Sequence, residues 1–564
     1  MMLLSNDPKE AEQQMYAVLY YLTTFGYIDG DFDLSEREFI QEHIQKLAEL
    51  QVRQSGGHEQ LSEKDYKALV QSRATHYNQV FEEIDRGIRA LFHEAVAANE
   101  SLNKFVYSRL KLRCYEIFQR FNEENRTRLM DVIDEFILAD GVTHPAEVEF
   151  RNELANLLNQ EILLDMDDLE IVPTTVSVAP EMQLKPTMAN HPLLRKLEQH
   201  YSADEKERAG QAKHEMDLVD RAILLLNAMR AKGKGRLNGA SQFFDLMQGD
   251  EFLDDHVFCI PPKPGRRYDI TVLGDLHGCY SSLKAALLQA DFFNKVDAFR
   301  RDPDNAPEPK LILIGDYIDR GNFSYNGTLR AVLNLFVRYP GHVYPLRGNH
   351  EYYFEYEGKI YGGVLPAEAI NGYRRYFPKE FFLKYMSLFD ELPTVVVFDQ
   401  MFFVHAGIPK ESTLDGWKDL SSLNDDQVRF EMIWSDPSEA DVIPRSMQED
   451  TARFPFGKKQ FASFMNRVGC NVMVRGHTKV VEGFKTIIDD GNYMLLNLFS
   501  AGGKYNDDLP LDSSYRDVTP KALTIDYENG EASMTPWAID YEEYNSPVYN
   551  RFFSSPPEIE PDGD

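Results

Sequence analysis

The sequence is poor in cysteine and contains no long apolar run. Its 564 residues include only four cysteines, which lie far apart and form no C-x-x-C pair, so neither a disulfide framework nor a structural zinc site is expected. No stretch reaches the ~18 consecutive apolar residues that a membrane-spanning helix needs. The first ten residues, MMLLSNDPKE, lack the basic start of a secretion signal. These absences predict a cytoplasmic protein.

Positive charge is also scarce. The chain has 60 Lys and Arg against 91 Asp and Glu, which gives a net charge of -31. Broad binding to nucleic acids or to anionic membranes requires a basic face that neutralises phosphates, so we expect neither kind of partner. The content of 43% apolar and 27% charged residues is typical of a folded soluble protein. Because a domain averages about 150 residues, the chain should form more than one.

Residues 1–164 show the apolar spacing of helices and almost no proline, which predicts an all-α domain. A unit of helix, Asp-Gly turn and helix occurs twice in it, at Asp29-Gly30 and at Asp140-Gly141. This repeat resembles the TerB-like helical domains, although an ordinary turn before a helix N-terminus explains the same residues. With 17 basic and 29 acidic side chains, two roles stay open for the domain: binding a protein partner and regulating access to a site elsewhere.

The rest of the chain divides by composition into four parts. Residues 165–190 are rich in Pro, Thr and Ser and predict a linker, and residues 191–260 return to helical spacing and predict a helical connector. Residues 261–540 consist of short β-branched runs between helical segments, which predicts an α/β domain. An acidic tail follows at residues 541–564. The chemistry-bearing motifs all lie in the third part.

Five strand-like runs in this part are each followed at once by polar residues. The motifs are GDLHG at 274–278, GDYIDRG at 315–321, RGNHE at 347–351, HAG at 405–407 and RGHT at 475–478. Buried strands that deliver Asp, Asn and His at their carboxyl ends place these groups along one edge of a sheet, where α/β proteins build their sites. Five such segments in order predict a metal cluster.

The spacing of these residues indicates two ions. Asp275 and His277 are two residues apart, so in extended backbone both side chains lie on one side and can bind one ion. Asp316 can bridge to a second ion. Asn349, His405 and His477 would complete the ligand set of that second ion. Oxygen and nitrogen ligands without thiolates suit Mn²⁺ best, with Fe and Zn as alternatives. The predicted cofactor is therefore a pair of divalent metal ions.

The five motifs resemble the signature of the phosphoprotein phosphatase family, a branch of the dinuclear metallophosphoesterases, and its bacterial serine/threonine phosphatases in particular. The resemblance covers roughly residues 265–540. It implies an α/β fold in which two mixed sheets form a sandwich flanked by helices. It also implies the same metal ligands, namely Asp275, His277, Asp316 as the bridge, Asn349, His405 and His477.

The resemblance implies roles for further residues. A hydroxide that bridges the two ions would attack phosphorus, since two divalent ions lower the pKa of a shared water to near 7. Arg320 and Asn349 would bind the phosphate, together with a second arginine, for which Arg453 is the nearest match and Arg445 competes. His350 would protonate the leaving oxygen, and Asp319 would orient His350.

Three functions follow from these features. The first is a hydrolase that removes phosphate from phosphoserine and phosphothreonine in proteins, and GNHE together with the full GDYIDRG favours it. The second is a hydrolase of dinucleoside polyphosphates or other nucleotides, because HAG and RGHT stand where eukaryotic phosphatases have HGG and RAHQ. The third is a non-catalytic scaffold whose helical domain recruits partners. The presence of all six ligands counts against the third.

Overall fold

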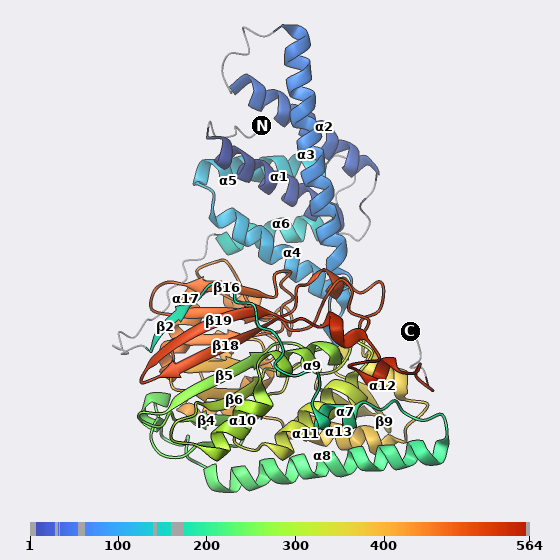
Figure 1. Ribbon diagram of the computed structural model, residues 1–564. Helices are drawn as coiled ribbons and strands as arrows, with labels where there is room; N and C mark the ends of the chain where they lie inside the picture. The colour runs from blue at the N-terminus through green and yellow to red at the C-terminus, as the bar shows by residue number, and fades with distance from the viewer. Residues whose placement is uncertain are drawn as a thin grey trace. The chain divides into compact units, whose positions relative to one another are not determined.

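The computed structural model describes residues 7–28, 32, 34–54, 62–138, 144–158 and 174–559. The chain divides into two compact units (Figure 1). The first, which we call the helical unit, consists of Met1–Val96, Glu100–Leu164 and Ser438–Thr451. The second, the catalytic unit, consists of Ala97–Asn99, Asp165–Pro437 and Ala452–Asp564. The Asp29-Gly30 and Asp140-Gly141 turns of the predicted repeat lie outside the described residues, so the TerB-like resemblance stays a prediction.

The helical unit is built around one buried helix, α1. Almost every residue of α1 from Val18 to Phe25 is buried, because α2 to α6 all pack against it. Two of the other helices begin at side-chain caps: Ser62 accepts a hydrogen bond from the Asp65 N–H and Asn122 accepts one from the Asn125 N–H. The helices are α1 (Pro8–Ile28), α2 (Leu34–Gln54), α3 (Glu63–Leu91), α4 (Leu102–Gln119), α5 (Glu123–Ile137), α6 (Pro145–Leu158) and the short α16 (Arg445–Gln448).

The catalytic unit contains two mixed β-sheets, as the sequence predicts. The first has the order β2 (Thr175–Val178), β19 (Glu531–Ala538), β18 (Lys521–Glu528), β5 (Arg267–Leu273), β6 (Glu308–Leu313) and β7 (Val343–Pro345). The second has the order β16 (Phe484–Asp489), β17 (Met494–Leu498), β15 (Val472–Arg475), β12 (Met401–Val404), β11 (Val395–Phe398), β4 (Val257–Ile260) and β3 (Phe252–Asp254).

The two sheets share one apolar core. Residues of both sheets, such as Ile270 of β5 and Val396 of β11, belong to a single buried cluster. The rings of Tyr268 on β5 and Phe398 on β11 lie with their centroids 4.9 Å apart in an edge-to-face arrangement. The sheets therefore pack face to face, which is the sandwich that the sequence predicts.

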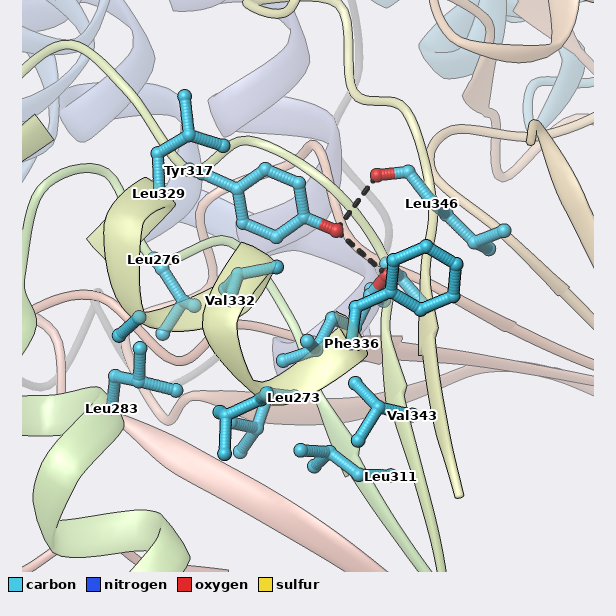
Figure 2. Close-up of a cluster of buried hydrophobic side chains, with 14 of the residues drawn as sticks. Leu273, Leu276, Leu283, Leu311, Tyr317, Leu329, Val332, Phe336, Val343 and Leu346 are labelled. Atoms are coloured by element: carbon cyan, nitrogen blue, oxygen red, sulfur yellow. Dashed lines mark hydrogen bonds between the residues drawn. The ribbon is translucent and has the colours of Figure 1, made fainter. Parts of the chain in front are cut away.

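Helices cover the first sheet at the strands that lead to the site. Helix α10 (Phe292–Arg301) packs against β6, and α8 (Glu205–Gly233) packs against α11 (Arg330–Arg338) and α13 (Lys379–Glu391) (Figure 1). Figure 2 shows Leu283 of α9 (Tyr280–Gln289), Val332 of α11 and the strand residue Leu311 in one buried apolar cluster. The Tyr317 hydroxyl donates to the carbonyls of Leu313 and Leu346 at 3.1 and 2.7 Å. This buried tyrosine anchors the loop after β6.

The remaining elements are short. They are β1 (Val96–Ala97), α7 (Pro192–Leu197), β8 (Tyr353–Tyr356), β9 (Lys359–Gly362), β10 (Val364–Leu365), α12 (Glu368–Tyr373), α14 (Glu411–Leu414), α15 (Asp426–Met432), β13 (Asp436–Pro437), β14 (Pro455–Phe456) and α17 (Lys458–Val468). The strands β18 and β19 form a hairpin whose turn residues, Asn529 and Gly530, have positive φ angles of 50° and 86°. No described helix is both long and apolar enough to cross a bilayer.

A buried ion pair ties α8 to α11. Arg330 donates from Nε to Glu215 at 3.0 Å, and the hydroxyls of Tyr201 and Tyr385 donate to the same carboxylate at 2.8 and 3.0 Å. Replacing Glu215 with alanine leaves the Arg330 charge buried and unpaired, so we expect the free energy of unfolding to fall by about 3–5 kcal/mol. Urea denaturation of the full chain measures this loss.

The matched control lies on the same helix. Asp220 pairs with Lys384 at 2.8 Å, but the two side chains are 49% and 35% exposed. An exposed ion pair contributes only about 0–1 kcal/mol, so Asp220→Ala should change the free energy of unfolding little. Equal losses from the two substitutions would contradict a structural role for the buried pair.

Candidate metal centre and active site

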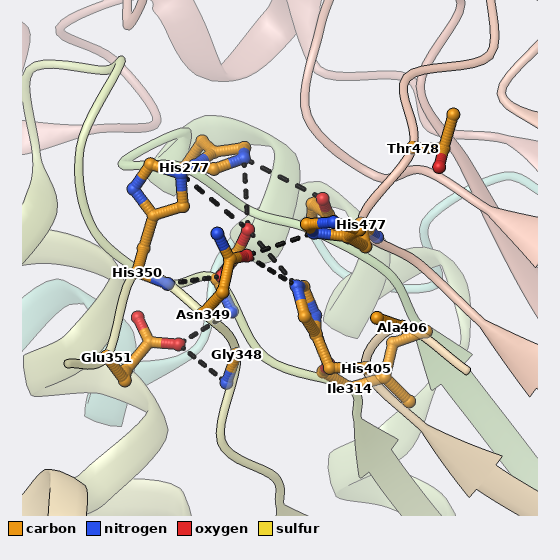
Figure 3. Close-up of polar contacts among 12 residues, drawn as sticks. His277, Ile314, Gly348, Asn349, His350, Glu351, His405, Ala406, His477 and Thr478 are labelled. Carbon is orange, nitrogen blue, oxygen red and sulfur yellow. Dashed lines mark hydrogen bonds and ion pairs between the residues drawn. The ribbon is translucent and has the colours of Figure 1, made fainter. Parts of the chain in front are cut away.

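The five motifs meet at the carboxyl ends of their strands. Asp275 and His277 follow β5, Asp316 follows β6, Asn349 follows β7, His405 follows β12 and His477 follows β15. The first five of these residues are at most 1% exposed, and the side chain of His477 is 3% exposed. Figure 3 shows the side chains of His277, His350, Asn349, His405 and His477 turned toward one another. The structure therefore brings together all six residues that the sequence predicts as metal ligands.

Asp316 is the centre of this cluster. Its Oδ2 lies 3.5 Å from His277 Nε2, 3.4 Å from His405 Nε2 and 4.0 Å from His350 Nε2. On one side of it, His277 Nε2 lies 3.7 Å from Asp275 Oδ2. On the other side, Asn349 Oδ1 lies 2.9 Å from His405 Nε2 and 3.0 Å from His477 Nδ1. One carboxylate thus lies between two groups of possible ligands.

The backbone at the cluster adopts a conformation that non-glycine residues rarely take. His277, Asp316 and His477 have φ angles of 41°, 53° and 64°. Such residues cost on the order of 1–3 kcal/mol each and concentrate at functional sites. Hydrogen bonds between the loops after β5 and β6 hold the first two of these residues, because the N–H groups of Leu276 and His277 donate to the Asp316 carbonyl at 2.9 and 2.8 Å. The loops aim these side chains inward at the expense of local stability.

Two glycines let the backbone reach the carboxylates. A Cβ added to Gly348 would lie 2.1 Å from Asp316 Oδ1, and one added to Gly476 would lie 2.2 Å from Asp275 Oδ1. Neither distance is compatible with any side chain larger than hydrogen. These contacts explain the glycines that precede Asn349 and His477 in the motifs.

Glu351 holds the loop after β6 rather than joining the cluster. Its carboxylate accepts hydrogen bonds from the N–H groups of Asp316, Tyr317 and Gly348 at 2.7, 2.8 and 3.0 Å (Figure 3). Burial raises the pKa of Glu351 to about 7. These three bonds fix the turn that carries Asp316 next to the turn that carries Asn349.

The ring orientations turn the Nε2 atoms of His277 and His405 toward the centre. His277 Nδ1 lies 3.1 Å from the Ile318 carbonyl and His405 Nδ1 lies 2.9 Å from the Ile314 carbonyl. A carbonyl only accepts, so Nδ1 carries the proton in each ring and Nε2 faces Asp316. Metal-binding histidines are oriented in the same way by backbone carbonyls.

Orphaned polar atoms test whether this cluster fits metal ions. Asp275 Oδ2, Asn349 Nδ2 and His477 Nε2 are buried and make no hydrogen bond within the described part of the chain. Buried polar atoms normally have partners, so a partner is expected here. Two overlapping groups, one around His277 and Asp316 and one around Asp316, His405 and His477, have ligand atoms close enough to hold an ion. Oxygen and nitrogen donors of this kind fit divalent cations.

The electrostatics of the cluster favour a cation. Burial raises the pKa of Asp275 to about 7. Burial alone would also raise the pKa of Asp316. The neighbouring His405 and His350 outweigh burial and hold the pKa of Asp316 well below its usual range. Burial lowers the pKa of His405, but the effect of the Asp316 carboxylate is larger and raises the pKa of His405 to about 9. Two buried carboxyl groups therefore draw positive charge to this point.

A histidine–aspartate pair stands beside the cluster. His350 Nδ1 lies 2.7 Å from Asp319 Oδ2, and Asp319 Oδ1 accepts a hydrogen bond from the Ala369 N–H at 2.7 Å. Burial lowers the pKa of His350, but the Asp316 and Asp319 carboxylates outweigh it and raise that pKa above its usual value. The Nε2 atom of His350 in this pair lies 4.0 Å from Asp316 Oδ2.

The predicted phosphate-binding arginines have acidic partners that sequence reasoning missed. Arg320 Nη1 donates to Glu368 Oε1 at 2.7 Å. Arg453 Nε donates to Asp436 Oδ2 at 2.8 Å, and Arg475 Nη2 donates to Asp436 Oδ1 at 2.9 Å. Arg453 is buried and belongs to the catalytic unit. Its competitor in the sequence, Arg445, is exposed on α16 and belongs to the helical unit.

The two mixed sheets, with carboxylates and histidines gathered at their strand ends, form the fold and the site of a metal-dependent hydrolase. Residues 268–481 match the family described as Calcineurin-like phosphoesterase. Over 237 residues the chain is 29% identical to the serine/threonine-protein phosphatase 4 catalytic subunit of Eremothecium gossypii, a match that covers 41% of this chain and 68% of that protein.

Solved structures of phosphatases are also similar to the chain. A protein serine/threonine phosphatase from Saccharomyces cerevisiae, with similarity to human phosphatase PP5, has 16% identity and a TM-score of 0.37, and the match covers 58% of this chain and 90% of that one. A cold-active protein-tyrosine phosphatase of a psychrophilic Shewanella has 14% identity and a TM-score of 0.29, with 52% of this chain and 84% of that one covered.

Proposed function

We propose that the protein removes phosphate from phosphoserine and phosphothreonine in other proteins with the help of two divalent metal ions. The observation that carries the proposal is the position of Asp316 between two groups of buried ligand atoms. The ions would be held by Asp275, His277, Asp316, Asn349, His405 and His477. Mn²⁺ suits these oxygen and nitrogen donors best, and Fe and Zn are the alternatives. When bound, such ions supply Lewis acidity toward the phosphate and lower the pKa of water.

His350 supplies the proton that the leaving group needs. An alkoxide of serine or threonine is a poor leaving group, so a proton must reach its oxygen as the bond to phosphorus breaks. Because Asp319 lies against Nδ1 at 2.7 Å, the proton to be transferred resides on Nε2. The Asp316 and Asp319 carboxylates outweigh burial and raise the pKa of His350, which favours the protonated ring.

Arg320, Arg453 and Asn349 bind the phosphate. Arg320 and Arg453 offer guanidinium N–H groups, which bind phosphate oxygens in a planar, bidentate manner. Each arginine is oriented by a carboxylate, Glu368 for Arg320 and Asp436 for Arg453. Asn349 offers the buried Nδ2 group. Positive charge at this point attracts a doubly charged phosphate although the whole chain carries -31.

The rings after the third motif bear on the choice between protein and nucleotide substrates. An exposed aromatic face would offer the base of a nucleotide a surface on which to stack. Phe354 and Tyr361 instead stack on each other with centroids 5.8 Å apart, and Tyr353 is buried against Tyr325 and Phe389. Tyr353 therefore packs within the protein, whereas Tyr356 is 61% exposed. The support for a protein substrate comes from the name of the relative from Eremothecium gossypii.

A substrate panel tests the proposal. The full chain, supplied with Mn²⁺, should release phosphate from phosphoserine and phosphothreonine peptides with a kcat/KM at least about 10-fold above that for diadenosine tetraphosphate, a difference of about 1.4 kcal/mol in transition-state binding. An Asp316→Asn preparation, purified identically, controls for contaminating phosphatases. Faster hydrolysis of diadenosine tetraphosphate would favour the nucleotide alternative, and activity on neither class would favour a scaffold.

A further inference from the structure

One segment of the catalytic domain belongs to the helical unit. Ser438–Thr451, which we call the captured segment, lies in the chain between β13 (Asp436–Pro437) and β14 (Pro455–Phe456). Those two strands pair with each other in the catalytic unit, with Asp436 opposite Pro455. The captured segment itself packs with the helices of the first 164 residues. The residues that flank the captured segment are therefore fixed in the catalytic unit, whereas the segment itself belongs to the helical unit.

Polar contacts with α4 hold both ends of the captured segment. Glu116, which is 8% exposed, accepts hydrogen bonds from the Ser438 hydroxyl at 2.6 Å and from the Glu439 N–H at 3.2 Å. Arg113 donates to Glu116 at 3.0 Å and to the Glu439 carboxylate at 3.2 Å. At the other end, Lys111 pairs with Asp450 at 2.5 Å.

An apolar cluster holds the middle of the captured segment. Leu112, Tyr115 and Leu157 of the helices are buried together with Ala440, Ile443 and Met447 of the segment. Ile443 and Met447 are only 1% and 2% exposed, and the Tyr115 hydroxyl donates to the Val442 carbonyl at 3.3 Å. Removing these contacts would expose apolar surface, so the packing opposes release of the segment.

Both ends of the captured segment lead directly to groups of the active site. Asp436 stands two residues before Ser438, and Arg453 stands two residues after Thr451. Asp436 accepts hydrogen bonds from Arg453 and from the Thr478 hydroxyl, at 2.8 and 2.6 Å. Thr478 in turn follows the cluster residue His477. A shift of either end of the segment would therefore displace the Asp436–Arg453 pair.

We propose that α4 positions Arg453 for phosphate binding through the captured segment, with Glu116 as the positioning residue. The inference rests on the proposed function, in which Arg453 binds phosphate. Glu116 touches no substrate. It fixes the first two residues of the segment, which directly follow β13, and the segment leads back to Arg453 in the loop before β14.

The first experiment separates positioning from folding. In the full chain with Mn²⁺, Glu116→Ala should raise KM for a phosphoserine peptide and Ki for inorganic phosphate about 5- to 10-fold, with kcat changed less than about 2-fold. Glu116→Gln keeps the accepting oxygen and should restore most of the affinity. Ser438→Ala removes the hydroxyl that donates to Glu116 and should also raise KM and Ki. A loss of kcat with unchanged KM and Ki would overturn the inference.

Asp134→Asn is the matched control. This substitution breaks the ion pair between Asp134 and Arg151 in the helical unit. The Asp134 side chain is half exposed, and the pair involves no residue of the captured segment. KM and Ki should stay at the values of the unmodified protein. An equal rise in both variants would show a general effect of the helical unit and would overturn the role of Glu116.

A double-mutant cycle tests whether Glu116 acts through Arg453. Arg453→Ala should itself raise Ki for inorganic phosphate, and adding Glu116→Ala should then raise it no further. A further rise in Ki in the double variant, as large as that caused by Glu116→Ala in the unmodified protein, would overturn this inference and leave the proposed function standing. An Arg453→Ala variant with unchanged Ki would remove the phosphate-binding assignment of Arg453 and the inference together, so the two failures are distinguishable.

Discussion

Replacing Asp316 with asparagine should lower kcat/KM for a phosphoserine peptide by at least about 10³-fold. The carboxylate faces the Nε2 atoms of His277 and His405 at 3.5 and 3.4 Å, and no other described carboxylate lies between the two groups of ligands. An amide removes one negative charge and one metal-binding oxygen. Metal ions stabilise transition-state charge by several kcal/mol, and each ~1.4 kcal/mol lost is a factor of ten in rate. Steady-state kinetics at saturating Mn²⁺ measure the effect.

A second buried aspartate provides the control for this substitution. Asp254 is 4% exposed and accepts hydrogen bonds from the N–H groups of Gly235 and Leu237 at 2.9 and 2.8 Å. Asp254→Asn should reduce stability without removing the activity of the folded fraction, and metal content should stay unchanged. Asp316→Asn should lose bound metal as well as activity. Retention of both by the Asp316 variant would contradict the bridging role.

Replacing His350 with alanine should cost on the order of 10²- to 10⁴-fold in kcat on a phosphoserine peptide. The loss on p-nitrophenyl phosphate should be distinctly smaller, because a phenolate has a conjugate acid of pKa near 10 or below and leaves with less help than an alkoxide. The motivating observation is the 2.7 Å contact of His350 with Asp319 beside the cluster. Parallel kinetics on the two substrates measure the difference.

His214→Ala is the control for the histidine substitution, since His214 is exposed on α8 and bonds only a backbone carbonyl among the described residues. Its kinetics on both substrates should match those of the unmodified protein. Losses of the same size on phosphoserine and on p-nitrophenyl phosphate would exclude His350 from protonating the leaving group and would leave it a purely structural role.

The arrangement of the cluster follows from local sequence pattern. Each of the five strand-like runs is a buried strand, and parallel neighbours such as β5, β6 and β7 end at the same edge of a sheet. A residue placed directly after such a strand therefore has a predictable position, which is why Asp275, Asp316 and Asn349 could be grouped from the sequence alone. The glycines before Asn349 and His477 added a further signal, because only close approach of backbone requires them.

Contacts across long sequence separations could not be predicted in the same way. Glu368 reaches Arg320 from α12, 48 residues away, and Glu116 reaches Ser438 over 322 residues. Periodicity reports which face of an element is buried and not what covers that face. The sequence places Ser438–Thr451 within the α/β domain at residues 261–540, whereas the structure assigns it to the helical unit. Without an observed partner, neither Glu116 nor Asp436 stands out among the 91 acidic residues of the chain.

Anomalous scattering from crystals grown with Mn²⁺ tests the central claim most directly. Two peaks should stand one on each side of the Asp316 carboxylate, one toward His277 and Asp275 and the other toward Asn349, His405 and His477. Density maps without anomalous peaks at Asp316, or with the ions bound only at surface carboxylates, would contradict the assignment of this cluster as a dinuclear metal centre.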